Sequence, residues 1–203
     1  RHADYFLALA ESAAQQMQGQ AKKEWLPRLD ADLDNLRAAF QWLRQQAPLQ
    51  AVALAGALKE FWYSRGYFQE GRQWLTQALA DLAAPVVKCQ AENEHLLGQR
   101  ARAWLALAQL AQHQGDYQPA LQWVEESIAL YRQVADLWGM AEALRESGWI
   151  TYGMNQRQAT LDRFAESLHL FRAVGDQAKI AALLTSLAYL QSGQELDYAQ
   201  SIA

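Results

Sequence analysis

The segment Glu126-Ser-Ile-Ala-Leu-Tyr-Arg-Gln-Val-Ala-Asp136 recurs forty residues later as Glu166-Ser-Leu-His-Leu-Phe-Arg-Ala-Val-Gly-Asp176. Six of the eleven paired positions are identical, and the exchanges of Ile for Leu, Tyr for Phe and Ala for Gly are conservative. A fixed internal period of this length is typical of solenoid proteins, in which each unit buries an apolar face that it cannot bury alone. The recurrence therefore predicts a chain of stacked structural repeats.

The same shift of forty residues aligns the sequence that precedes each of these segments. It superposes small or apolar residues in three sets, namely Ala101 with Ala141 and Ala181, Leu144 with Leu184, and Ala108 with Gly148 and Ala188. We therefore expect two complete repeats, at 101–140 and 141–180, followed by the truncated start of a third at 181–203.

Each repeat has the pattern of two helices joined by a short turn. In the first repeat, apolar residues recur with the i, i+3, i+4, i+7 spacing of one helix face, at Trp104, Leu107, Ala108 and Ala111. Gly115-Asp116 then suits a turn, because glycine tolerates positive φ and aspartate can cap the next helix. The apolar side of that next helix consists of Ala120, Trp123, Val124, Ile128 and Tyr131.

Residues 101–127 resemble the tetratricopeptide repeat. They match its order of large, large, small, turn, aromatic and small positions at Trp104, Leu107, Ala108, Gly115, Tyr117 and Ala120. They depart from it at Ala111, where that family usually has a second aromatic residue, and in a period of forty rather than about thirty-four residues. HEAT and armadillo repeats also run near forty residues, so the class of repeat stays open. The resemblance implies an all-α, right-handed solenoid of antiparallel helix pairs with about ten helices.

An earlier and more divergent helix pair precedes these repeats. Its residues Gly66, Phe68, Gly71 and Trp74 follow the order of Gly115, Tyr117, Ala120 and Trp123. Two further amphipathic helices are expected before it, from His2 to about Met17 and from Trp25 to Leu43.

Proline marks the best internal boundary, because Pro85 should end the helix before it. We therefore divide the chain into an N-terminal helical pair at 1–47, which links to upstream modules, the divergent pair at 48–84, and the tetratricopeptide-like repeats at 85–203.

Eight tryptophans are many for a chain of this length, and most of them fit the core. Packing positions or apolar helix stripes hold Trp25, Trp42, Trp62, Trp74, Trp104 and Trp123. Trp149 differs, because the repeat register places it on the inner face of a first helix.

The composition of the chain limits which partners and which compartment are expected. The net charge is −4 and no basic stripe is visible, which argues against direct binding of nucleic acid. A single cysteine, Cys89, excludes an internal disulfide and fits a reducing compartment, so we expect a cytoplasmic protein. No apolar run reaches the length of a membrane span, so we expect no membrane association.

Candidate catalytic and metal-binding groups do not form a recognisable constellation. The histidines His2, His95, His113 and His169 are scattered, and none has another histidine four residues away. Cys89 has no Cys-x-x-Cys partner, so an incidental thiol is the better interpretation than a nucleophile. We therefore expect no enzyme activity, no metal and no cofactor.

An ordered run of short segments in the first eighty residues carries a second resemblance. The run comprises Tyr5-Phe-Leu-Ala-Leu-Ala-Glu11, Trp25-Leu-Pro-Arg-Leu29, Asp34-Asn-Leu-Arg-Ala-Ala39, Phe61-Trp-Tyr-Ser-Arg-Gly66 and Glu70-Gly-Arg-Gln-Trp-Leu75. It resembles the helical region after the nucleotide-binding and winged-helix modules of STAND-type signalling ATPases, among them bacterial LuxR-type and maltose-regulon-like transcriptional activators. The resemblance implies a sensor arm that restrains or releases an ATPase switch.

Features of the chain itself place that switch elsewhere. The chain has no Gly-rich loop ending in Gly-Lys-Ser/Thr. It begins at Arg1 inside an amphipathic pattern and stops at Ala203, where another helix is expected to start. We therefore expect a fragment of a longer protein, in intramolecular contact with an upstream nucleotide-binding module.

The first helices of tetratricopeptide pairs line a concave groove. Projecting the repeat register onto that face selects twelve candidate ligand- or partner-binding residues: Glu60, Tyr63, Arg102, Gln109, Gln112, His113, Glu142, Arg145, Trp149, Tyr152, Thr185 and Tyr189. Aromatic rings, arginines and adaptable amides are what binding hot spots favour.

The expected function is that of a non-catalytic ligand-sensing and protein-interaction domain, which controls the switch of a larger signalling and transcription regulator. Its groove would bind a protein, a peptide or a small inducer. A stand-alone peptide-binding tetratricopeptide adaptor and a small-molecule, sugar-like receptor domain stay as alternatives.

Overall fold

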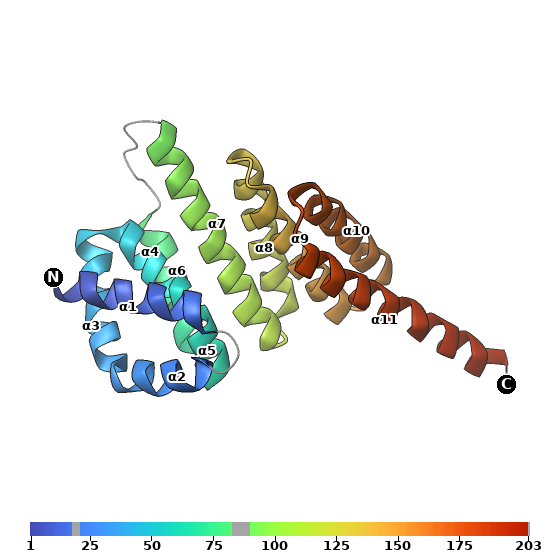
Figure 1. Cartoon of the computed structure of the whole chain (residues 1–203), viewed down its shortest axis with the longest axis horizontal. Helices are drawn as coiled ribbons and strands as arrows, with labels where there is room; N and C mark the ends of the chain where they lie inside the picture. Colours follow the sequence, from blue (N-terminus) through green and yellow to red (C-terminus); the bar gives the residue numbers. More distant parts are fainter. Residues whose placement is uncertain (18–20, 83–89, 203) are drawn as a thin grey trace.

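The computed structural model describes residues 1–17, 21–82 and 90–202, with side chains through 1–17, 21–82 and 92–190. All regular elements in these ranges are helices (Figure 1). They are α1 (His2–Gln16), α2 (Lys22–Ala31), α3 (Leu33–Gln46), α4 (Pro48–Ala57), α5 (Lys59–Arg65), α6 (Phe68–Asp81), α7 (Gln90–His113), α8 (Tyr117–Gln133), α9 (Leu137–Gly153), α10 (Arg157–Val174) and α11 (Gln177–Ile202).

Helices α7 to α11 form the stack that the repeat predicts. Each packs on the next along the chain, and Figure 1 shows them following one another away from the N-terminal helices. The turns between them keep a strict period, because the backbone takes positive φ at Gly115, Ala135, Asn155 and Gly175, twenty residues apart. One helix and one turn thus occupy twenty residues. The predicted all-α solenoid of antiparallel helix pairs is confirmed.

Two buried serines close the helix pairs in the same way. Ser127 on α8 donates its hydroxyl to the carbonyl oxygen of Ala101 on α7, at 2.8 Å. Forty residues later, Ser167 on α10 donates to the carbonyl oxygen of Ala141 on α9, at 2.7 Å. The serine shared by the two recurring segments therefore ties each second helix to the backbone of its first helix.

The aspartate cap expected at Asp116 is not formed, whereas the equivalent aspartates of two later turns do cap the helices that follow them. Asp136 accepts from the backbone N–H of Gly139 at 2.8 Å, and Asp176 accepts from that of Lys179 at 3.0 Å. Asp116 precedes α8 but makes no such cap bond. Its carboxylate instead pairs with Arg72 on α6, at 2.5 Å.

The N-terminal part contains more breaks than its hydrophobic pattern predicts. The single helix expected from Trp25 to Leu43 is two helices, α2 and α3, which meet at Asp32. Asp32 is the N-cap of α3, and its side chain accepts from Asn35 at 3.2 Å. Short polar side chains of this kind compete with helical hydrogen bonding and favour helix starts, so the apolar stripe continues across a bend.

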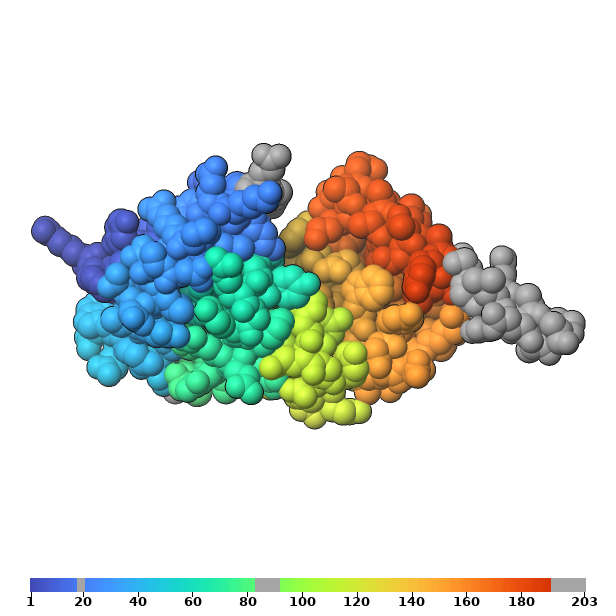
Figure 2. Space-filling model, turned by 90° about the horizontal axis from the view of Figure 1, so that it is seen from below, coloured from blue at the N-terminus to red at the C-terminus, as the bar shows by residue number. Residues whose placement is uncertain are grey.

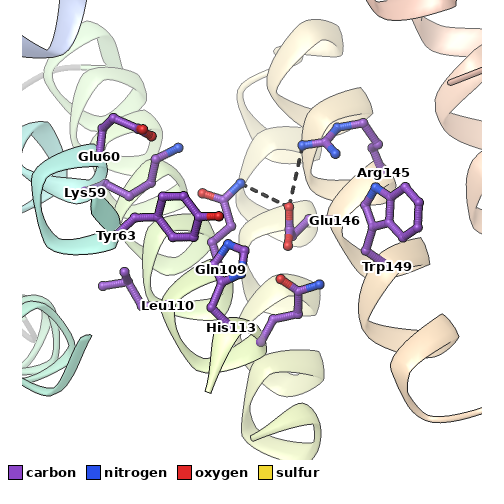
Figure 3. A pocket seen from close by; sticks show the side chains of 10 residues that line it. Lys59, Glu60, Tyr63, Gln109, Leu110, His113, Arg145, Glu146 and Trp149 are labelled. Atoms are coloured by element: carbon purple, nitrogen blue, oxygen red, sulfur yellow. Dashed lines mark hydrogen bonds and ion pairs between the residues drawn. The ribbon is translucent and has the colours of Figure 1, made fainter. Parts of the chain in front are cut away.

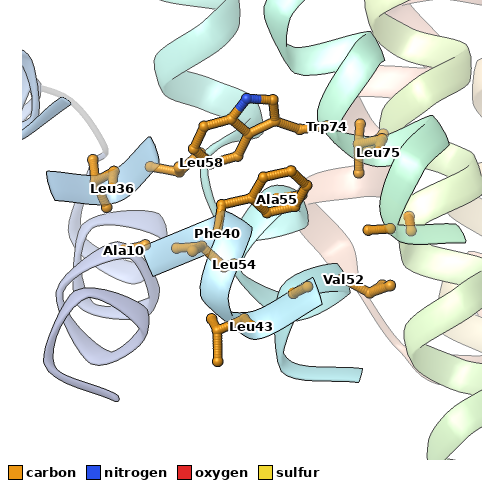
Figure 4. Close-up of a cluster of buried hydrophobic side chains, with 14 of the residues drawn as sticks. Ala10, Leu36, Phe40, Leu43, Val52, Leu54, Ala55, Leu58, Trp74 and Leu75 are labelled. Atoms are coloured by element: carbon orange, nitrogen blue, oxygen red, sulfur yellow. The ribbon is translucent and has the colours of Figure 1, made fainter. Parts of the chain in front are cut away.

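The N-terminal core is built around stacked aromatic rings (Figure 4). Phe40 and Trp74 stack face to face with centroids 4.1 Å apart, and the fully buried Trp62 meets Trp74 edge-on. Trp42 does not belong to this core, because its side chain is 53% exposed. The buried residues of α3 are Leu36, Ala39, Phe40 and Leu43, and Trp42 lies to one side of that stripe.

Two sequence predictions concern the proposed boundary at Pro85 and the last residues of the chain. Pro85 and Cys89 lie outside the described residues. α7 begins at Gln90, eleven residues before the expected repeat start at Ala101. The expectation of a new helix at the end of the chain is wrong for the described part, since α11 continues without a break to Ile202. None of the helices in the described ranges combines the length and hydropathy needed to cross a membrane.

Candidate functional site

Three helices surround a hollow on the inner side of the stack. It has a volume of about 400 Å³ and lies between α5, α7 and α9 (Figure 3). Its lining comprises Lys59, Glu60 and Tyr63 from α5, Gln109, Leu110, Gln112 and His113 from α7, and Arg145, Glu146 and Trp149 from α9. Seven of the twelve residues selected from the sequence lie in this hollow: Glu60, Tyr63, Gln109, Gln112, His113, Arg145 and Trp149.

A second hollow of about 730 Å³ continues the first and shares Lys59 and Gln109 with it. It runs between α1 and α4 on one side and α9 and the start of α11 on the other, with α7 between them. Arg102 and Glu142 of the predicted set line this second hollow. We call the two hollows together the inner groove. Figure 2 shows the molecule hollowed between the blue N-terminal helices and the red-orange α11.

Aromatic side chains stand on both sides of the first hollow. Tyr63 on α5 contacts the His113 ring of α7, with centroids 4.4 Å apart. On the opposite side, Trp149 meets Phe164 of α10 edge-on at 5.2 Å and Tyr152 at 5.9 Å. Because Phe164 is fully buried, Trp149 is held in place and presents a rigid aromatic edge to the groove.

A buried charge network forms the α9 wall. Arg145 lies 2.7 Å from Glu142 and 3.6 Å from Glu146, while Lys179 of α11 lies 2.9 Å from Glu142. Burial would raise the pKa of Glu142, but the hydrogen bonds from Arg145 and Lys179 outweigh it and hold that pKa below its ordinary value. Burial likewise opposes ionisation of Arg145, and Glu142 overcomes it and raises the pKa of Arg145. The Glu142–Arg145 pair therefore stays ionised at neutral pH.

One polar atom of the groove lacks a partner. Gln109 donates from Nε2 to Glu146 at 3.1 Å, which fixes the orientation of its amide. Its Oε1 atom is buried and has no hydrogen-bond partner among the described residues. Leaving a buried acceptor unpaired costs about 1–3 kcal/mol. A ligand N–H or O–H at this point would recover that cost.

Three of the predicted residues lie outside the two hollows. Tyr152 stands behind Trp149, and its ring contacts that side chain rather than the groove. Thr185 and Tyr189 are exposed on α11, and the Thr185 hydroxyl bonds to the Ala181 carbonyl of its own helix. The repeat register could not distinguish Thr185 and Tyr189 from true groove residues, because α11 lines the groove only near its start, at Lys179.

The twelve predicted residues do not include Lys59, Leu110 and Glu146 of the first hollow or Lys179 of the second. Glu146 could have been predicted from the sequence, because Glu142, Glu146 and Trp149 follow the i, i+4, i+7 spacing of one helix face. Lys59 could not have been predicted, since the hydrophobic pattern does not reveal the break between α4 and α5, at which Lys59 begins the new helix.

The arrangement suits binding. His113, the histidine of the groove, contacts the rings of Tyr63 and Phe68. Within the part of the chain that the structure describes, no three His, Cys, Asp or Glu side chains are close enough to hold a metal ion. The groove thus combines rigid rings, a paired charge network and one unsatisfied acceptor.

Comparison with known sequences points to regulators. No family model matches the chain. Over 191 residues, the chain is 28% identical to proteins named putative HTH-type transcriptional regulator, one from Mycobacterium bovis and two from strains of Mycobacterium tuberculosis. The match covers 91% of this chain and 20% of each relative, so the chain spans about a fifth of their length.

Comparison with solved structures identifies the fold. BtubC (BKLC) from P. vanneervenii superposes with a TM-score of 0.65 at 20% identity, over 87% of this chain and 70% of that one. The TPR-like repeats of a putative kinesin light chain from Podosopora anserina give a TM-score of 0.50 at 16% identity, over 96% and 98% of the two chains. The chain therefore has a tetratricopeptide-like fold, and its sequence relatives are proteins named as transcriptional regulators.

Proposed function

We propose that this chain is a non-catalytic sensing and interaction arm of a larger transcription regulator, and that its inner groove binds the partner or inducer that sets the state of that regulator. The observation that carries the proposal is the buried, unpaired Oε1 atom of Gln109, a residue that lines the same hollow as the Tyr63–His113 ring pair and Trp149. The relatives named as regulators supply the context of a longer protein.

The charges of the groove support binding over catalysis. Glu60 is paired with Lys22 at 2.5 Å, and Glu142 is paired with both Arg145 and Lys179. The carboxylate of Glu142 is a poor proton acceptor, because the hydrogen bonds from Arg145 and Lys179 hold its pKa below the ordinary value. The groups left for a ligand are aromatic faces, amides and the amine of Lys59, which has no ion pair among the described residues.

The size of the groove favours an extended protein segment. The first hollow alone matches a small metabolite, since ligand pockets are commonly about 300–1,000 Å³. The second hollow adds about 730 Å³ and adjoins the first at Lys59 and Gln109. A peptide or a segment of a neighbouring module fills both. By resemblance to STAND-type regulators, such binding would control a nucleotide-driven switch in another part of the protein.

The test uses the whole regulator with a transcription reporter. Tyr63→Ala and Lys59→Ala remove groove side chains, and Tyr5→Ala on the exposed face of α1 is the matched control. We expect the inducible response to fall by roughly 10- to 30-fold in the groove variants, as for hot-spot residues, with protein level and promoter binding unchanged. A normal response in both groove variants would contradict the proposal.

A further inference from the structure

Lys59 and Gln109 mark the junction of the two hollows. Each of them lines both hollows, so a segment that runs from one hollow into the other passes these two side chains. Lys59 stands on α5 and Gln109 on α7. The amine of Lys59 has no ion pair among the described residues, and the Oε1 atom of Gln109 has no hydrogen-bond partner there. The junction therefore offers one donor group and one acceptor to a ligand.

Glu146 sets which end of the Gln109 amide faces the ligand. An ionised carboxylate has acceptors only, so the atom of Gln109 that lies 3.1 Å from Glu146 Oε2 is the amide nitrogen (Figure 3). Arg145 forms an ion pair with the same carboxylate oxygen at 3.6 Å. With its nitrogen committed to Glu146, the amide presents its oxygen as a fixed, buried acceptor.

A fixed acceptor discriminates between ligand groups. An amide N–H can donate to Gln109 Oε1, whereas a carboxylate or an ester oxygen offers only lone pairs and leaves that atom unpaired. The charge of Glu146 behind the amide also disfavours an anion at this point. The junction thus favours a neutral group with an N–H and rejects the free carboxylate of a chain terminus.

Extended main chain has the matching pair of groups. The N–H and the C=O of one residue point to the same side of a strand, as they do when two strands exchange hydrogen bonds. Gln109 Oε1 can accept that N–H, and the Lys59 amine can donate to that C=O. One residue of the segment then satisfies both groups of the junction. Its side chain lies in a hollow that Tyr63 and Trp149 also line, which suits an apolar residue.

We propose that the inner groove reads an internal main-chain amide of an extended polypeptide segment, and that Glu146 determines this specificity by holding Gln109 as an acceptor. The inference rests on the proposed function, since it requires that the groove binds a ligand. Glu146 is a positioning residue, because it acts on the ligand through Gln109.

The test compares three small probes on the complete chain. The first is N-acetyl-leucine N-methylamide, which has two main-chain amides around one apolar side chain. The second is the same molecule with both amide nitrogens methylated, so that it has no N–H, and the third is N-acetyl-leucine with its free carboxylate. Side-chain amide and indole signals of Gln109 and Trp149 in nitrogen-15 NMR titrations report binding, and Gln109→Leu assigns the amide signal. A ligand of about thirteen non-hydrogen atoms should bind with a dissociation constant near millimolar.

We expect the N-methylamide to bind at least about tenfold more tightly than either of the other probes, because only it satisfies the buried acceptor. Glu146→Gln should reduce this preference to within about threefold, because a glutamine can donate as well as accept and lets the Gln109 amide turn over. Gln109→Leu should abolish the preference as well. The ratio of affinities is measured within each variant, so a loss of stability does not imitate the effect.

Glu125→Gln is the matched control. Glu125 also has an interhelical ion pair, with Arg163 at 2.6 Å, but it lines neither hollow. This variant should keep the full preference for the N-methylamide.

Two results would overturn this inference while leaving the proposed function intact. One is equal binding of the three probes, and the other is an unchanged preference in Glu146→Gln, since shifts at Gln109 and Trp149 would still show a ligand in the groove. If no probe shifts either signal up to its solubility limit, both this inference and binding in the first hollow are wrong.

Discussion

Gly148 on α9 lies directly against the ring of Phe164 on α10, so closely that a Cβ atom on the glycine would come within 3.0 Å of the ring. Phe164 is fully buried, so its ring can give way only by displacing neighbouring core atoms. Gly148→Ala should therefore lower the free energy of unfolding by about 1–3 kcal/mol, as overpacking does. Urea unfolding followed by circular dichroism measures this change.

The matched control for that substitution is Gly98→Ala on α7, where no atom lies within 4 Å of the added Cβ. It should raise the free energy of unfolding by up to about 1 kcal/mol, because alanine is the better helix former. Phe164→Val should recover part of the loss in the Gly148→Ala background. Equal effects of the two alanine substitutions would show that the close approach is not what requires Gly148.

The left-handed turn residues give a pair of opposite predictions. Ala135 and Gly175 occupy the same place in successive repeats, with φ values of 53° and 76°. A residue with a Cβ atom pays about 1–2 kcal/mol for this conformation. Ala135→Gly should therefore raise the thermal midpoint, and Gly175→Ala should lower it by a similar amount. A shift in the same direction for both variants would refute the argument.

The serine closure of the second pair has a measurable contribution. Ser167→Ala removes the buried hydroxyl that donates to the Ala141 carbonyl, and should cost about 1 kcal/mol in denaturant unfolding. Ser12→Ala on α1 removes a hydroxyl whose exposed hydrogen bond stays within its own helix, at the Ala8 carbonyl, and should cost nothing. If Ser167→Ala is also neutral, the shared serine is not a structural tie.

The repeat region could be predicted from the sequence because one physical requirement recurs in it. Each second helix needs an apolar stripe with a serine in its middle, and each turn needs a residue that accepts positive φ. Both requirements leave a visible trace every forty residues. The N-terminal part has no such recurrence, so the bend at Asp32 and the exposure of Trp42 are consequences of tertiary packing that a helical stripe does not reveal.

The sequence predicts which helix faces line the groove, but it does not predict all the residues that close the groove into a cavity. The register identifies the inward side of α7 and α9, and therefore Gln109, His113 and Trp149. It does not show that α5 supplies Lys59 to the groove or that Lys179 on α11 pairs with Glu142 on α9. It also treats α11 as a third equal repeat, although Tyr189 lies away from the groove.

The Glu142 network predicts a specific loss of stability in acid. The pKa of Glu142 in the folded protein lies below its ordinary value of 4.5, because Arg145 and Lys179 outweigh the effect of burial. A carboxylate with a lowered pKa contributes stability above its unfolded pKa, and that contribution disappears as the pH falls through the folded pKa. Glu142→Gln should therefore cost about 1.5–3 kcal/mol at pH 7, the range for hydrogen bonds to charged groups.

The difference between the native protein and Glu142→Gln should shrink once the pH drops below about 4.5, where the Glu142 carboxylate of the unfolded chain begins to take up a proton, and should be lost as the pH falls through the lower pKa of the folded protein. Urea unfolding at pH 7, 5, 4 and 3 measures it. Glu24→Gln, at an exposed carboxylate on α2, is the control and should show no comparable pH-dependent difference. A difference for Glu142→Gln that stays constant from pH 7 to pH 3 would mean that the amide fails through its shape, and that the charge of Glu142 does not stabilise the α9 wall.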